Sequence, residues 1–141
     1  MFSTPVTCAN TTGDRSTATN YQDLWWNPNE SGWGMNVTQQ GTIAFATLFD
    51  YDANGKPLWF VMPNGPQTSA GNFSGPLYTV KGPAFNSSPW DATKVVATNV
   101  GTMTLHFTSG NAGTLTYTVN GSSVTKSIQR QTFSSPLPQC Q

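Results

Sequence analysis

Only two side chains in this sequence are obvious candidates for acid–base catalysis: the single histidine, His106, and the single glutamate, Glu30. A serine hydrolase would need a nucleophilic serine beside that histidine, and the chain contains no GxSxG elbow. A glycosidase would need two carboxylates facing each other across the scissile bond, and the few carboxylates show no such pairing. We therefore predict a protein that is not an enzyme. A hydrolase using Glu30 or His106 remains the third hypothesis.

A second cluster of oxygen-bearing side chains resembles the first half of a calcium loop. Asp50, Asp52 and Asn54 stand at alternate positions before Gly55, the spacing at which oxygens converge on a hard cation. The twelfth position of such a loop is Val61, where a bidentate glutamate is required. The Asn-Gly pair also forms a β-turn by itself. We expect no metal and no cofactor, and we keep these three residues as a weak calcium candidate.

Two basic residues fall on a face that should point inward. Lys126 and Arg130 share one side of the last expected strand with aliphatic residues. Cations inside a barrel must be neutralised by Glu30 or an aspartate, or must bind an anionic group of a ligand. A bulge near Gln129 would instead place Arg130 outside, and the sequence leaves both registers open.

Five tryptophans suggest stacking surfaces. Trp25 and Trp26 are adjacent, so in a strand they point to opposite faces, and one of them should face solvent or a pocket. Trp90 lies in a Ser-Ser-Pro-Trp-Asp loop. An exposed indole among amide side chains is suited to stacking on sugar rings. The predicted ligand-binding residues are the apolar platforms Trp25, Trp26, Trp90 and Tyr78 and the polar partners Asn36, Gln39 and Arg130.

Composition excludes several partner classes. Only 9% of residues are charged, and the formal net charge is zero. Nucleic acids and anionic membranes are recognised by clustered Lys and Arg, and no such cluster is present. No apolar run is long enough for a transmembrane helix, so no membrane insertion is expected. The length fits one domain with a sizeable core. The oligomeric state is left open.

Apolar residues alternate with polar ones at period two, and turn residues recur every eight to twelve positions, which is typical of antiparallel strands. Met103, Leu105 and Phe107 face one way in one such run. Two-residue hairpin turns are expected at Asn54-Gly55 and at 120–121, and a break at 63–66. The expected strands comprise 21–26, a run through 33–38, 43–51, 58–62, 73–80, a run through 102–108, 114–119 and 124–133.

These strands predict an all-β fold, an antiparallel up-and-down meander of seven or eight strands closed as a small barrel, with a β-sandwich as the alternative. The β domain should span 21–133, between a polar N-terminal tail (1–20) and a C-terminal tail (134–141). Cys8 and Cys140 stand near opposite ends, so a disulfide tying the tails together is plausible. Such a bond requires an oxidising compartment and points to a secreted, periplasmic or cell-surface protein.

Two segments carry a family resemblance. WWNPNESGWGMNVTQQG (Trp25–Gly41) is followed by FATLFDYDANGKPLWFVM (Phe45–Met62). Together they resemble a WWxPxESGWG/YDANGxPLW module of secreted and cell-envelope proteins of Gram-negative bacteria. The resemblance implies an exported β module and no particular reaction.

From these features we expect a secreted, non-catalytic binding or adhesion module. Carbohydrate is the preferred ligand class, because exposed indoles among uncharged polar groups suit sugar rings. The alternative is a protein–protein interaction or self-assembly module of the cell envelope, because exposed aromatics also anchor protein interfaces. The expected partner is thus a glycan or another envelope protein.

Overall fold

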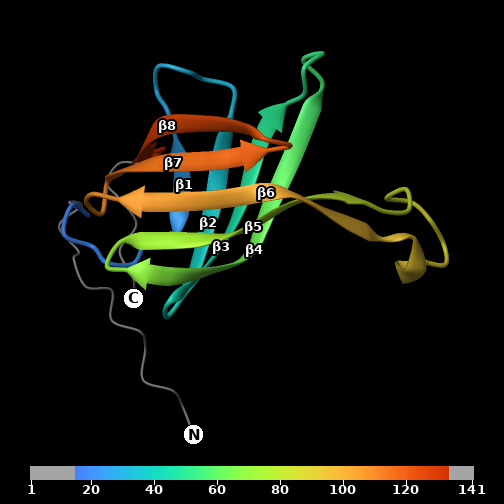
Figure 1. Cartoon of the computed structure of the whole chain (residues 1–141), viewed down its shortest axis with the longest axis horizontal. Helices are drawn as coiled ribbons and strands as arrows, with labels where there is room; N and C mark the ends of the chain where they lie inside the picture. Colours follow the sequence, from blue (N-terminus) through green and yellow to red (C-terminus); the bar gives the residue numbers. More distant parts are fainter. Residues whose placement is uncertain (1–14, 134–141) are drawn as a thin grey trace, which may run out of the picture.

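The structure, a computed structural model, describes residues 15–133 and shows eight antiparallel strands closed into a barrel (Figure 1). Each strand pairs with the next along the chain, and β1 pairs with β8 to close the ring. The predicted up-and-down barrel is confirmed, and the β-sandwich alternative is wrong. The strands are β1 (Asp23–Trp26), β2 (Gly34–Gln40), β3 (Ile43–Tyr51), β4 (Pro57–Ser69), β5 (Asn72–Lys81), β6 (Val96–Phe107), β7 (Ala112–Val119) and β8 (Ser122–Arg130), with one 3-10 turn, η1 (Ala92–Lys94).

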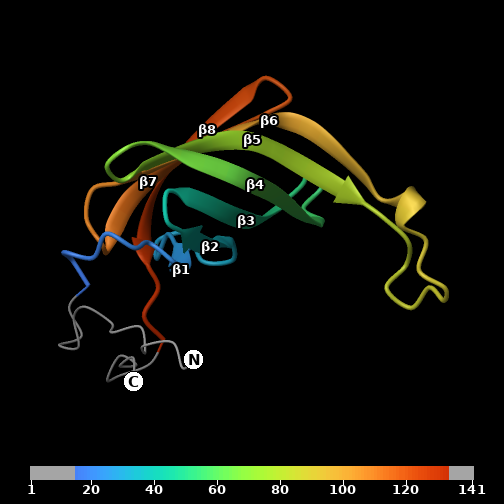
Figure 2. The ribbon, with the colours of Figure 1, turned by 90° about the horizontal axis from the view of Figure 1, so that it is seen from below.

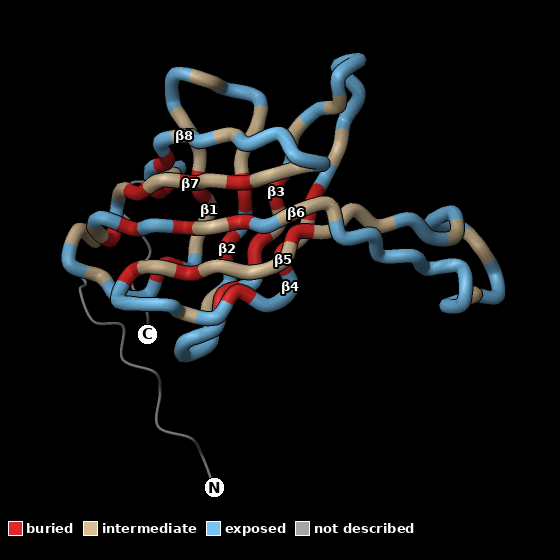
Figure 3. The backbone as a smooth tube through the Cα atoms, viewed as in Figure 1, coloured by how far each residue is buried: buried red, intermediate tan, exposed pale blue. Residues whose placement is uncertain are grey.

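Alternate residues of each strand fill the barrel interior, as the period-two pattern requires. Figure 3 shows these buried positions recurring along the strands of the barrel wall. The interior is packed with large side chains. The largest that are fully buried are Trp25, Phe73, Met35, Leu48, Met62, Leu77, Met103, Leu105 and Leu115.

The predicted break at 63–66 is wrong. β4 runs on through these residues to Ser69, and its pairing with β3 shifts register between Ala44 and Ala46. The irregularity accommodates Pro63, which cannot donate a ladder hydrogen bond. Gly75 of β5 is needed beside this bend, because a Cβ there would lie 2.2 Å from the Asn64 carbonyl oxygen. The Pro-Asn-Gly-Pro run therefore bends a strand and does not end it.

The hairpin between β3 and β4 is longer than the predicted two-residue turn. The Asp52 amide donates to the Lys56 carbonyl, and the Gly55 amide donates to the Asp52 carbonyl. Gly55 has a φ of 74°, whereas Asn54 does not share the positive φ that the shorter turn would demand. The other predicted turn, between β7 and β8, does have positive φ at both Asn120 and Gly121.

Strands β5 and β6 continue past the barrel as a two-stranded arm, which we define as residues 78–99 (Figures 1 and 2). The pairing slips by one residue between Leu77 and Tyr78, where the arm begins. At this bend Gly101 lies against β7 so closely that a Cβ would be 1.8 Å from the Thr118 carbonyl oxygen. The arm is thus a defined extension of the sheet.

Residues 15–20, which we assigned to the polar tail, lie against one end of the barrel. The Gly110 amide donates to the Ser16 carbonyl, and Arg15 forms an ion pair with Asp23. The predicted disulfide between Cys8 and Cys140 falls outside the described residues. Among residues 15–133, no helix is long and apolar enough to span a membrane.

Candidate functional site

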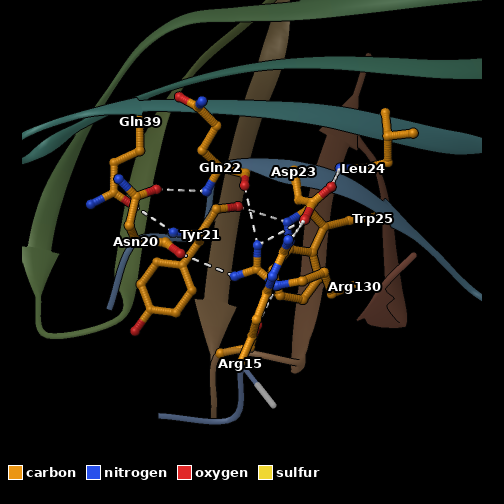
Figure 4. A network of polar contacts seen from close by, with 10 residues as sticks. Arg15, Asn20, Tyr21, Gln22, Asp23, Leu24, Trp25, Gln39 and Arg130 are labelled. Atoms are coloured by element: carbon orange, nitrogen blue, oxygen red, sulfur yellow. Dashed lines mark hydrogen bonds and ion pairs between the residues drawn. The ribbon is translucent and has the colours of Figure 1, made fainter. Parts of the chain in front are cut away.

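Arg130 closes one end of the barrel interior (Figure 4). Its side chain is 5% exposed, and its guanidinium donates to the carbonyl oxygens of Gly110, Asn20 and Gln22 and to the Asp23 carboxylate at 2.7–3.1 Å. The pKa of the guanidinium is lowered from its usual value, because the effect of burial exceeds the opposing effect of the hydrogen bond to Asp23. The unbroken alternation of β8 places Arg130 inside, so the alternative with a bulge near Gln129 is wrong.

Three predicted ligand-binding residues therefore have structural roles. Arg130 has its guanidinium occupied by the chain itself. Gln39 accepts a hydrogen bond from the Tyr21 amide and donates to the Gly41 carbonyl. Trp25 is fully buried, and its indole Nε1 donates to the Tyr21 carbonyl at 2.8 Å. These side chains hold the end of the barrel together and present nothing to a ligand.

A second polar group lies on the inward side near the other end of β8. Lys126 Nζ is 2.7 Å from Glu30 Oε2, and the Trp33 indole Nε1 donates to the same oxygen at 2.9 Å. The Tyr117 hydroxyl donates to Asp50 Oδ2 at 2.7 Å, and burial together with this bond raises the pKa of Tyr117. Each inward cation of β8 thus has a carboxylate partner within the chain.

The Glu30–Lys126 pair predicts a pH dependence. The hydrogen bonds from Lys126 and then Trp33 hold the pKa of Glu30 below its ordinary value of 4.5. A depressed pKa in the folded state stabilises the fold above pH 4.5, and this contribution is lost as the pH falls through the folded-state pKa. We expect Glu30→Gln to lower the free energy of unfolding at neutral pH, with the difference from wild type shrinking below pH 4.5. Urea unfolding of the wild type and of Glu30→Gln, at neutral pH and at about pH 3, measures this difference in unfolding free energy. A difference that stays constant with pH would contradict the assignment.

The residues considered for catalysis are not arranged for it. His106 lies on the exposed face of β6, and its Nδ1 is 2.5 Å from Asn72 Oδ1, an amide oxygen that cannot become charged. Glu30 is held by Lys126 in an ion pair. No contact between His106 and Glu30 is found among the described residues.

The candidate calcium residues diverge. Asp50 points inward to Tyr117, whereas Asp52 Oδ1 accepts the backbone amides of Asn54 and Lys56. Within residues 15–133 no three metal-binding side chains come together. The Asp52 carboxylate organises the turn, which accounts for its place in the sequence.

The outer surface of β3 and β4 carries an apolar stripe that takes no part in the packed core. Phe45, Phe49 and Tyr51 occupy alternate positions of β3 and are 43%, 48% and 50% exposed. Trp59 of β4 is paired with Phe49 and is 45% exposed. Tyr51 is held in place because its hydroxyl donates to the Gly32 carbonyl at 2.7 Å. We call Phe45, Phe49, Tyr51 and Trp59 the aromatic stripe.

The stripe continues into a groove over β1 and β2. Gly34 lies between Trp26 and Phe49 in the sheet, and its lack of a side chain leaves a groove of about 260 Å³. Asn36 also lines the groove and is exposed. The Trp26 Nε1 is buried and has no hydrogen-bond partner among the described residues. Aromatic rings and an amide thus surround one concave surface.

The predicted binding residues are divided between separate places. Trp26 and Asn36 meet at the groove. Tyr78 is half-buried on β5 and pairs with Val61, which lies on the same outer surface as the stripe. Trp90 is 57% exposed in the loop at the end of the arm. The predicted set therefore does not form one site.

Sequence reasoning predicted the strand 43–51 but missed the aromatic stripe on it. An apolar face is expected to point into a barrel, and here the interior side of β3 is taken by Ala44, Ala46 and Leu48. The sequence did contain a signal of an exposed apolar surface, because both faces of this strand are apolar. A strand with two apolar faces has more hydrophobic surface than a one-sided core requires.

Comparisons with protein-family models, curated proteins and solved structures find no match to this chain. What the groove and the stripe can bind is therefore inferred from their own residues.

Proposed function

We propose that the protein is an exported, non-catalytic binding module that holds an uncharged glycan on the outer face of β1–β4. The observation that carries the proposal is the aromatic stripe, which continues into the groove beside Trp26. An exposed apolar patch of this kind, rimmed by polar residues, marks a binding surface. This outer face is the concave surface on which exposed aromatic rings gather beside uncharged polar groups.

The spacing of the rings suits an extended ligand. Alternate residues of a strand are about 6.8 Å apart and neighbouring strands about 4.8 Å apart, so Phe49, Tyr51 and Trp59 present successive ring faces along the sheet. Sugar rings have apolar faces that stack on aromatics while their hydroxyls bond outward. A single polysaccharide that stacks on several rings at once binds more tightly than any one weak stacking contact would allow.

The polar groups of β2 beside the stripe are uncharged, and the one charged residue that lines the hollow along Phe49, Tyr51 and Trp59 is an acid, Asp50. Asn36, Thr38 and Gln40 face outward from β2 beside the β3 aromatics, and amides and hydroxyls both donate and accept hydrogen bonds. No charged residue lines the groove or the hollow beside Phe45. A glycan bearing carboxylates or phosphates would lack a cation partner here, which favours a neutral one.

An extracellular or periplasmic location accords with this ligand class. The scarcity of charge and the resemblance of Trp25–Gly41 to an exported module support this part of the proposal. Glycans of cell envelopes and surroundings are the polymers that such a module would meet.

The test is titration of the protein with soluble neutral polysaccharides, followed by intrinsic tryptophan fluorescence and calorimetry. We expect saturable binding that Phe49→Ala and Trp59→Ala each weaken about tenfold, since each removes a stacking platform worth about 1.4 kcal/mol. Trp90→Ala is the matched control, because Trp90 is an exposed aromatic residue outside the site. It should bind as wild type does.

Circular dichroism establishes that the variants fold, which is expected because both stripe side chains are about half exposed. A flat response across neutral polysaccharides would overturn the proposal. Binding that Trp90→Ala abolishes and Phe49→Ala leaves intact would move the site to the arm.

A further inference from the structure

The two strands of the arm pair with each other and with almost no strand of the barrel. In it Tyr78 to Lys81 of β5 pair with Val96 to Asn99 of β6. β7 pairs with β6 only from Met103 onward, and the pairing of β4 with β5 reaches no further toward the arm than Tyr78. Among residues 15–133, no third strand lies along the arm. Both of its edges are open.

Over residues 96–99, beyond the irregularity at the base of the arm, the open edge of β6 carries no lysine, proline or bulge. Residues 95–99 read VVATN, without a charge or a proline. Val95 and Val96 are 43% and 54% exposed. The charged residues of the arm's loop, Asp91 and Lys94, are paired with each other at 3.6 Å. Proteins protect edge strands with lysines, prolines or bulges, because an unpaired edge recruits another strand.

The loop at the end of the arm adds exposed aromatics. Phe85 is 97% exposed and Trp90 57% exposed, and the tube in Figure 3 is mostly exposed along this segment. A two-stranded hairpin alone is marginally stable in water and needs a third strand or a packing partner. An ordered arm with an apolar end is therefore better explained by a partner than by the barrel alone.

We propose that the arm is a self-association element, in which the β6 edge over residues 96–99 pairs antiparallel with the same edge of a second copy. Such pairing about a two-fold axis joins two arms into a four-stranded sheet. The antiparallel arrangement brings each arm's end, with Phe85 and Trp90, beside the base of the partner's arm. The chain has zero formal net charge, so two copies approach without net repulsion.

Sedimentation velocity of the whole chain, without glycan, from low micromolar to near-millimolar concentration, tests the proposal. We expect a monomer–dimer equilibrium, because an interface of one short strand pair and a loop is in the size class of transient contacts. Thr98→Lys places like charges close together across the two-fold axis and should weaken dimerisation at least tenfold. Phe85→Ser should weaken it as well, without affecting folding.

Thr102→Lys is the matched control, because Thr102 is an exposed threonine on the same strand, next to the part paired with β7. It should dimerise as wild type does. A monomer at all concentrations, or a Thr98→Lys protein that dimerises normally, would overturn the proposal. Dimerisation is measured without a glycan, so its outcome is independent of the glycan titration.

Discussion

Arg130→Met is expected to lower the free energy of unfolding by about 3 kcal/mol, and the melting temperature by about 10 °C. The side chain is almost fully buried, and its four hydrogen bonds join β8 to the chain before β1, to Asp23 and to Gly110. Methionine fills a similar volume but leaves the carbonyl oxygens of Asn20, Gln22 and Gly110 without their charged donor. Urea unfolding followed by circular dichroism measures the change.

Two further variants separate the causes of this loss. Arg130→Lys keeps the charge, but a single ammonium cannot span the same acceptors as the planar fork, so an intermediate loss is expected. Lys126→Met removes the other inward cation of β8, four residues earlier. Lys126 is 31% exposed on its side chain and pairs with an equally accessible Glu30, so its loss should be much smaller. Equal losses for Arg130→Met and Lys126→Met would contradict the role given to burial.

The barrel itself follows from local information. Antiparallel strands joined by short turns pair with their neighbours, and an eight-strand meander with an apolar face closes to bury it. Alternation along β8 indicated an inward face for Lys126 but left the register at Arg130 open, and the structure places both inside with the partners Glu30 and Asp23. Those partners lie about a hundred residues away in sequence, so no local pattern identifies them.

The proposed binding surface was harder to predict, because alternation defines two faces and not which one is inside. On β3 the larger side chains, Phe45 and Phe49 among them, point out and the alanines point in. Only the space left by the other strands of the closed barrel decides this. The arm is a similar case, since VVATN at 95–99 indicates a strand equally well whether it has one neighbour or two.

The adjacent tryptophans give the sharpest test of which face is inside. Trp25→Ala is expected to lower the free energy of unfolding by about 4 kcal/mol, because it leaves a cavity in a packed core. The Trp25 ring contacts Phe107 with centroids 4.6 Å apart, the Arg130 guanidinium lies 5.1 Å above it, and its Nε1 donates to Tyr21. Trp26→Ala, on the outer face, should cost about 1 kcal/mol, because this ring is partly solvated already.

Both substitutions replace tryptophan by alanine, and they differ only in the face of β1 that carries the residue. The ratio of the two losses in unfolding free energy therefore reports which residue faces the interior. Far-UV circular dichroism during urea unfolding is the appropriate readout, since each variant also removes a fluorophore. The glycan titration should respond in the opposite sense: Trp26→Ala weakens binding at the groove, whereas Trp25→Ala, studied well below its melting temperature, keeps the groove residues Gly34 and Asn36. Equal losses of stability would contradict the assignment of faces, and a binding defect confined to Trp25→Ala would reverse it by placing Trp25 and not Trp26 on the ligand side.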